Sequence, residues 1–235
     1  MPLSPHEIKA LIANDLWLPL ARKGGDQLFP QKRKHKGMKL LTLTDMDYQE
    51  IELFEENKLI RRESVVAWTP SYLQQLRLEA DLGPSKVLSI GRFDDVIIDS
   101  GQEIFEALPC DLLNMDFFSQ KPSNSNGRIE KEVNCENIIV RRSNELRLKG
   151  FVLFHTTLVD QTDLNITNLT FPFSVLQEFA NPACSLEDKM KFIRNALDSI
   201  MQNNNYVIVE SAEKLIDLGG GDKLFSVGLI SMRRI

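Results

Sequence analysis

Short apolar runs recur along the first half of the chain, at residues 39–45, 64–69, 86–90 and 111–116. Between them, hydrophobic side chains recur at helical spacing over residues 46–60, 71–80 and 97–108, a pattern typical of helices with one buried face. Buried strands that alternate with helices in this way are typical of crossover units in a parallel sheet. The first half is therefore predicted to form a parallel sheet flanked by helices.

The second half continues this pattern and then changes it. Residues 150–157 form a fifth apolar run, and residues 136–147 are predicted to be a helix, although Ile138, Ile139 and Val140 leave a strand possible. Ser185 is placed to cap a long helix that ends near residue 203. Two further strands, at residues 206–209 and 223–232, are joined through three glycines and predict an antiparallel hairpin. The fold class is α/β, with a mostly parallel sheet and a C-terminal antiparallel hairpin.

The N-terminal segment has a different character. Ser4, Pro5 and Glu7 form a helix-start signal, after which residues 22–39 become basic and rich in glycine and proline. We interpret residues 1–38 as an N-terminal helix and basic arm, and residues 39–235 as the sheet domain. The arm is either a solvated loop or a contact for RNA or DNA. Its candidate contact residues are Arg22, Lys23, Lys32, Arg33, Lys34 and Lys36.

Composition narrows the function classes. The chain has 235 residues, 43% of them hydrophobic and 26% charged, with a net charge of −5, so it is not a general polyanion binder. No apolar run is long enough to predict a transmembrane helix. The cysteines, Cys110, Cys135 and Cys184, are widely spaced and favour reduced thiols in a cytoplasmic protein. The histidines are equally scattered, and no metal site is predicted.

Candidate site residues gather where the predicted strands end. Right-handed crossovers place the carboxyl ends of parallel strands on one edge of the sheet, where ligands bind in open α/β sheets. Acidic, basic and aromatic side chains follow three of these strands, namely Asp45, Asp47, Arg92, Asp116, Phe117 and Phe118. Each has an ordinary alternative: the acids could cap helices or turns, Arg92 could be solvated, and the two phenylalanines could belong to the core.

Three stretches resemble a class I S-adenosylmethionine-dependent methyltransferase domain, which has a Rossmann-like fold. Residues 41–47, which end in Asp45-Met46-Asp47, and residues 55–59 resemble the second motif of that family. Residues 111–118, which contain Asp116-Phe117-Phe118, resemble its fourth motif, with a faint similarity to the partner proteins of three-cysteine-motif systems. The third stretch is the C-terminal hairpin, because the family's sheet ends in a reversed strand.

The resemblance implies S-adenosylmethionine as cofactor and assigns roles to these residues. Asp45 or Asp47 would hold the ribose of the cofactor, with Arg92 as a further cofactor contact. Asp116 would lie near the methyl donor, and Phe117 or Phe118 would stack on a target base.

The family's first motif, a strand followed by a glycine-rich turn, has no counterpart in the sequence. If residues 39–45 are the family's second strand, the first strand is missing; if they are the first, the residues that follow contain no glycine. Two functions are therefore kept. One is a methyltransferase that acts on nucleic acid, and the other is a catalytically silent Rossmann-like subunit of a larger assembly.

Overall fold

The computed structural model describes residues 4–44, 49–69, 72–83, 87–89, 109–117, 128–159, 185–219 and 222–234. Within these ranges, seven strands form one sheet in the order β3-β2-β1-β4-β5-β7-β6. The strands are β1 (Met38–Leu43), β2 (Ile60–Thr69), β3 (Val87–Ser89), β4 (Leu112–Asp116), β5 (Gly150–Leu158), β6 (Tyr206–Gly219) and β7 (Asp222–Arg233).

Strands β1 to β5 are parallel to one another, whereas β7 is antiparallel to both β5 and β6. The predicted fold class, a mostly parallel sheet that ends in an antiparallel hairpin, is confirmed. The central strands are almost uninterrupted apolar runs because both of their faces are covered by helices.

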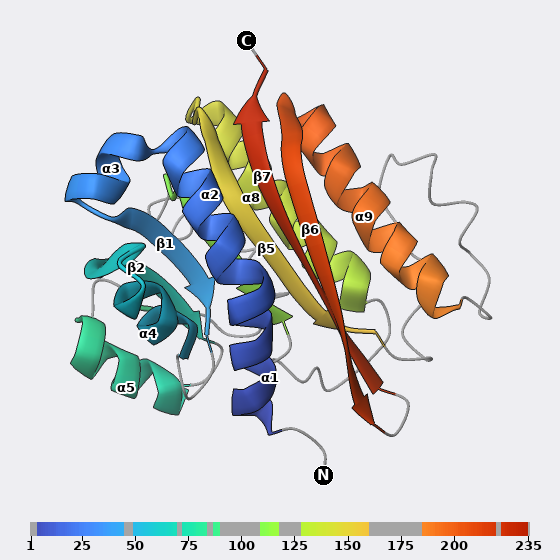
Figure 1. The fold of residues 1–235 in the computed structure, drawn as a ribbon, viewed down its shortest axis with the longest axis horizontal. Helices are drawn as coiled ribbons and strands as arrows, with labels where there is room; N and C mark the ends of the chain where they lie inside the picture. Colours follow the sequence, from blue (N-terminus) through green and yellow to red (C-terminus); the bar gives the residue numbers. More distant parts are fainter. Residues whose placement is uncertain are drawn as a thin grey trace.

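Helices cover both faces of the sheet (Figure 1). One face is covered by α1 (Pro5–Ile12), α2 (Leu18–Leu28), α4 (Gln49–Glu56) and α5 (Tyr72–Leu82), and the other by α8 (Arg128–Glu145) and α9 (Leu186–Asn203). A short helix, α3 (Pro30–His35), follows α2. The core therefore has two hydrophobic layers, separated by the sheet. In the described ranges, no helix is both long and apolar enough to cross a membrane.

The N-terminal segment is more regular than predicted. The capping box at Ser4 is present, but the chain stays helical through a π-helical turn, η1 (Ala13–Trp17), and on to Leu28. The prediction of a turn-rich basic loop was wrong, because these residues form the end of α2 and then α3. Proline at the first position of α3 starts that helix instead of breaking the chain.

Other helix and strand boundaries in the structure differ from the predicted ones by a few residues. The helix predicted for residues 46–60 ends at Glu56, and β2 begins at Ile60. The choice between helix and strand after residue 136 is settled as helix α8, which begins at Arg128. Ser185 caps α9 as predicted, with a complete capping box. The helix predicted for residues 97–108 lies outside the described residues.

Gly24 explains why α2 can lie close against the sheet. It is buried inside α2, and a Cβ atom at this position would overlap Cγ2 of Val152 on β5. A β-branched strand residue has little freedom to move aside. The absence of a side chain at Gly24 therefore sets how closely the N-terminal helix approaches β5.

We predict that Gly24→Ala destabilises the protein by about 1–3 kcal/mol through overpacking, although alanine is the better helix former. Combining it with Val152→Ala removes the overlapping methyl group. The double variant should therefore be at least as stable as Val152→Ala alone. Urea unfolding of the four proteins measures both effects. Equal destabilisation by Gly24→Ala in the two backgrounds would contradict the close-contact explanation.

Candidate functional site

The strand order has a topological switch point between β1 and β4. From β1 the chain builds outward through β2 and β3, and then returns to place β4 and β5 on the other side of β1. In open α/β sheets, ligands bind outside the carboxyl ends of the strands at such a switch point. Here β1 ends at Leu43 and β4 ends at Asp116.

Three charged side chains are buried together at this point. The ammonium group of Lys9, on α1, lies 3.1 Å from Oδ2 of Asp116 and 3.6 Å from Oε2 of Glu50. Their side chains are 3%, 1% and 0% exposed for Lys9, Asp116 and Glu50, respectively. We call these three residues the charge cluster. It joins the first helix, the first turn of α4 and the end of β4.

Polar groups extend the charge cluster along the sheet. The hydroxyl of Thr42, on β1, donates to Oε1 of Glu50 at 3.4 Å. The amide of Asn114, on β4, donates to that hydroxyl at 3.3 Å, as the register that pairs Thr42 with Asn114 allows. Both side chains are fully buried. The carboxyl ends of β1 and β4 are thus connected by polar contacts instead of the apolar packing found along the rest of the two strands.

Sequence reasoning missed Lys9 and Glu50, although a signal was present. Lys9 precedes Ile12, Ala13 and Leu16 by three, four and seven residues, so it lies on the buried stripe of its helix.

Glu50 likewise precedes the apolar residues Leu53 and Phe54 by three and four residues, so it also lies on the apolar face of its helix. A charged residue in the middle of an apolar helical face is rarely buried without a partner. The two positions could therefore have been paired with Asp116.

The electrostatics of the charge cluster favour a role beyond stability. Burying an ion costs several kcal/mol, and buried ion pairs are weak evidence for stabilisation. Charged groups gathered at the carboxyl ends of parallel strands are functional-site candidates. In this position the carboxylates and the ammonium group could contact a polar or charged group of a ligand.

The predicted site residues have different placements. Asp116 belongs to the charge cluster. Phe117, the next residue, lies on the opposite face of the sheet, where it is 3% exposed within the core against α8 and α9. Successive residues of a strand point to opposite faces, so Asp116 and Phe117 are not brought together. The remaining predicted site residues, Asp45, Asp47, Arg92 and Phe118, lie outside the described residues.

A second buried polar group lies on that opposite face. Nδ1 of His155, on β5, is 2.7 Å from Oε1 of Glu136, and Nε2 is 4.0 Å from Oε2 of Glu132. The His155 ring also packs against Phe117, with ring centroids 5.4 Å apart. Burial raises the pKa of Glu136, and His155 opposes this shift. Among the residues that the structure describes, no group of three His, Cys, Asp or Glu side chains is arranged to hold a metal ion.

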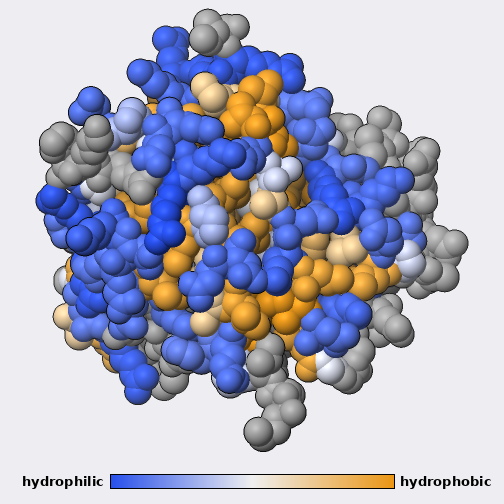
Figure 2. Space-filling view, in the orientation of Figure 1, coloured by the Kyte–Doolittle hydropathy of each residue, from blue (hydrophilic) through white to orange (hydrophobic). Residues whose placement is uncertain are grey.

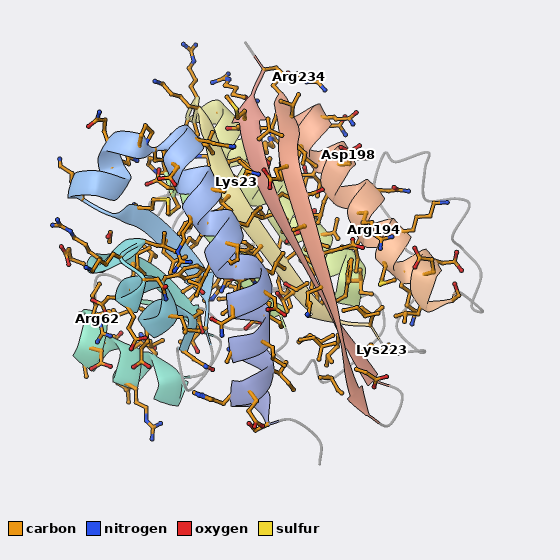
Figure 3. The ribbon with its side chains drawn as sticks, in the orientation of Figure 1. Lys23, Arg62, Arg194, Asp198, Lys223 and Arg234 are labelled. Atoms are coloured by element: carbon orange, nitrogen blue, oxygen red, sulfur yellow. The ribbon has the colours of Figure 1, made fainter. Side chains whose placement is uncertain are left out.

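Several basic residues predicted to contact nucleic acid have partners within the chain. Lys23, on α2, forms an ion pair with Glu210 on β6 at 2.6 Å (Figure 3). Lys32 pairs with Asp111 at 2.7 Å, and Arg22 donates to Asn57. The Lys23 and Lys32 side chains nevertheless remain 53% exposed, and Lys36 is exposed. Arg33 and Lys34 belong to α3.

No family model matches the sequence, and no curated protein matches it. Solved structures overlap with the chain at low identity. TYW2 from M. jannaschii, in complex with AdoMet, is 10% identical over 90% of this chain and 77% of its own, with a TM-score of 0.43. The 16S rRNA (adenine(1408)-N(1))-methyltransferase from Catenulisporales acidiphilia is 11% identical, with 88% and 91% covered and a TM-score of 0.41. Magnesium protoporphyrin IX methyltransferase from Synechocystis PCC 6803, with bound SAH, is 9% identical, with 93% and 87% covered and a TM-score of 0.40.

The fold is identified from the sheet itself. The order 3-2-1-4-5 is that of a Rossmann sheet, and the antiparallel β7 supplies the reversed strand of class I methyltransferases. The protein therefore has a methyltransferase-like Rossmann fold. In this order β1 lies between β2 and β4, the position of the first strand in a Rossmann sheet, and the next strand along the chain, β2, ends at Thr69. The role of Asp45 and Asp47, which lie outside the described residues, stays a prediction.

We predict that Lys9→Met destabilises the protein by about 3–5 kcal/mol, because it removes the ammonium group that contacts both buried carboxylates. Adding Asp116→Asn and Glu50→Gln removes both charges, so the triple variant should be more stable than Lys9→Met alone. Lys223→Met, at an exposed pair with Asp217, is the control and should change stability by less than about 1 kcal/mol. Urea unfolding decides the order, and a triple variant less stable than Lys9→Met would contradict the charge argument.

Proposed function

We propose that the protein is an S-adenosylmethionine-dependent methyltransferase whose methyl donor binds above the charge cluster, and that its substrate is nucleic acid. The observation that carries the proposal is the burial of Lys9, Glu50 and Asp116 at the carboxyl ends of β1 and β4. In a sheet of this type, that is where a ligand is expected.

The charge of the charge cluster suits this cofactor. S-adenosylmethionine carries a sulfonium cation, and the cluster contains two carboxylates, those of Asp116 and Glu50. When bound, the cofactor would supply an electrophilic methyl group, and the reaction converts the sulfonium into a neutral thioether. A carboxylate beside the sulfonium would therefore favour the donor over its demethylated product. The residues that would hold the cation are Asp116 and Glu50.

Lys9 would act by positioning the two carboxylates. Its ammonium contacts both of them, so it limits their mutual repulsion and holds Asp116 at the end of β4. Thr42 and Asn114 fix the Glu50 side of the charge cluster. Methyl transfer depends mainly on holding a nucleophile in line with the methyl group. A rigid, pre-organised set of side chains at the strand ends meets that requirement, and few side chains need to take part in the reaction directly.

The basic helix α3 and the residues around it support nucleic acid as the substrate. Lys32 and Lys36 project exposed charge from an otherwise acidic protein. Clustered lysine and arginine side chains are the electrostatic footprint of binding to phosphate backbones.

One observation favours a second function, the catalytically silent subunit. Residues 44–49 join β1 to α4 and contain no glycine. In the methyltransferase family that this chain resembles, the turn after the first strand is glycine-rich, because glycines let the backbone approach the cofactor closely. A chain that has lost this turn could keep the fold and the charge cluster without binding the cofactor.

Calorimetric titration distinguishes the two functions. We predict that S-adenosylmethionine binds with a Kd below about 1 mM, and that Asp116→Asn weakens binding about tenfold, equivalent to about 1.4 kcal/mol. The demethylated product should bind more weakly than the donor because it lacks the cation. Glu213→Gln, at an exposed pair on β6, is the control. No detectable heat at millimolar cofactor would favour the silent subunit.

Salt-dependent binding tests the nucleic-acid substrate. Neutralising Arg33, Lys34 and Lys36 to alanine should weaken binding to RNA or DNA and make the salt dependence shallower, because fewer counterions are released. Lys32 is left intact, since it pairs with Asp111. Binding by fluorescence anisotropy at several salt concentrations measures the slope. An unchanged affinity and salt slope would contradict the proposal that α3 contacts nucleic acid.

A further inference from the structure

The outermost strand, β6, has an unusual outer edge. It is 14 residues long, and in the described part of the chain no strand pairs with its outer side. Long edge strands can pair with a strand from another chain, because their outward N–H and C=O groups are hydrogen-bonding templates. Proteins usually protect such edges with charges and bulges. An edge that also exposes large apolar residues is therefore a candidate for an interface with another chain.

Two large hydrophobic residues are exposed on this strand. Val209 is 45% exposed and Leu215 is 39% exposed, and each lies three residues from Ala212 in the sequence. Hydrophobic residues come to the surface among hydrophilic ones over the β6–β7 hairpin in the space-filling view (Figure 2). Three charged residues lie between Val209 and Leu215. Glu210 and Lys214 are placed symmetrically about Ala212, and the third, Glu213, forms an ion pair with Arg194 on α9.

We propose that β6 is the interface for a second copy of this chain, which pairs with it in antiparallel register centred on Ala212. In that register Glu210 lies opposite Lys214 of the second copy, and Lys214 lies opposite its Glu210. The regular part of β6 begins at Glu210, because its register with β7 shifts between Ile208 and Glu210. The contact is isologous, as in a two-fold symmetric dimer, and it would extend the two sheets into one.

The faces of the strand agree with this register. Glu210 forms an ion pair with Lys23 on α2, and Lys214 forms one with Asp15 on η1, each at 2.6 Å. Both side chains therefore lie on the face of the sheet that the N-terminal helix covers. Residues opposite each other in an antiparallel pair share a face, so the two charges can meet across the interface.

Neighbouring registers are less favourable. A centre at Ser211 places Glu210 opposite Ala212, and a centre at Glu213 places it opposite Ile216. A centre at Glu210 or at Lys214 places like charges directly opposite each other, which is destabilising. Among these registers, the centre at Ala212 is the one in which every Glu210 and Lys214 meets an opposite charge. Opposite-charge pairs of this kind help to specify the register and also contribute to stability.

Charge exchange tests the proposal. Sedimentation velocity over a range of protein concentrations should show a dimer for the natural sequence. Glu210→Lys should weaken dimerisation at least tenfold, because lysine then faces lysine at two symmetric places, and Lys214→Glu should do the same. The double exchange, Glu210→Lys with Lys214→Glu, should restore the dimer, since each charge again meets its opposite.

Controls separate this contact from the ion pairs within one chain. Lys23→Met removes the partner of Glu210 in the same chain and leaves the interface register intact, so the dimer should persist. Circular dichroism and thermal unfolding check that each variant is folded. A monomeric natural protein at every concentration, or a single exchange that remains fully dimeric, would overturn the proposal. A folded double variant that remains monomeric would overturn the register.

Discussion

The ammonium group of Lys9 is the contact on which the arrangement of the carboxyl edge depends. It joins α1 to Asp116 at the end of β4 and to Glu50 at the start of α4, so one side chain links three elements that are distant in sequence. The N-terminal helices are held along the same face by close packing at Gly24 against β5. Together these contacts make the N-terminal segment a layer of the fold, and they place a positive charge at the carboxyl ends of β1 and β4.

This arrangement bears on the proposed cofactor site. In the family that the chain resembles, the backbone of a glycine-rich turn approaches the cofactor after the first strand. Here β1 is the first strand, and the residues that follow it contain no glycine. The polar groups at the carboxyl ends of β1 and β4 are side chains, namely those of the charge cluster, Thr42 and Asn114. Such side chains can recognise a cation through charge. Backbone contacts to the rest of a ligand would have to come from other residues.

Much of the fold could be predicted from the sequence, because apolar runs and helical stripes repeat along the chain. Strands β1, β4 and β5, the cap at Ser185 and the C-terminal hairpin follow directly from such patterns. The N-terminal segment could not be predicted in the same way. Its glycines and Pro30 resemble loop residues, and only contact with β5 explains a buried Gly24 within a helix. Of the site, Asp116 was found from its position at a strand end, whereas Lys9 and Glu50 required knowledge of which helices meet there.

Hydrogen exchange measured with and without S-adenosylmethionine reports where the ligand acts on the chain. We predict slower exchange in peptides that contain the charge cluster, at α1, the start of α4 and the end of β4, with unchanged exchange in β6 and β7. Protection confined to other parts of the chain, or no protection at saturating cofactor, would contradict the assignment of the crevice between β1 and β4 as the cofactor site.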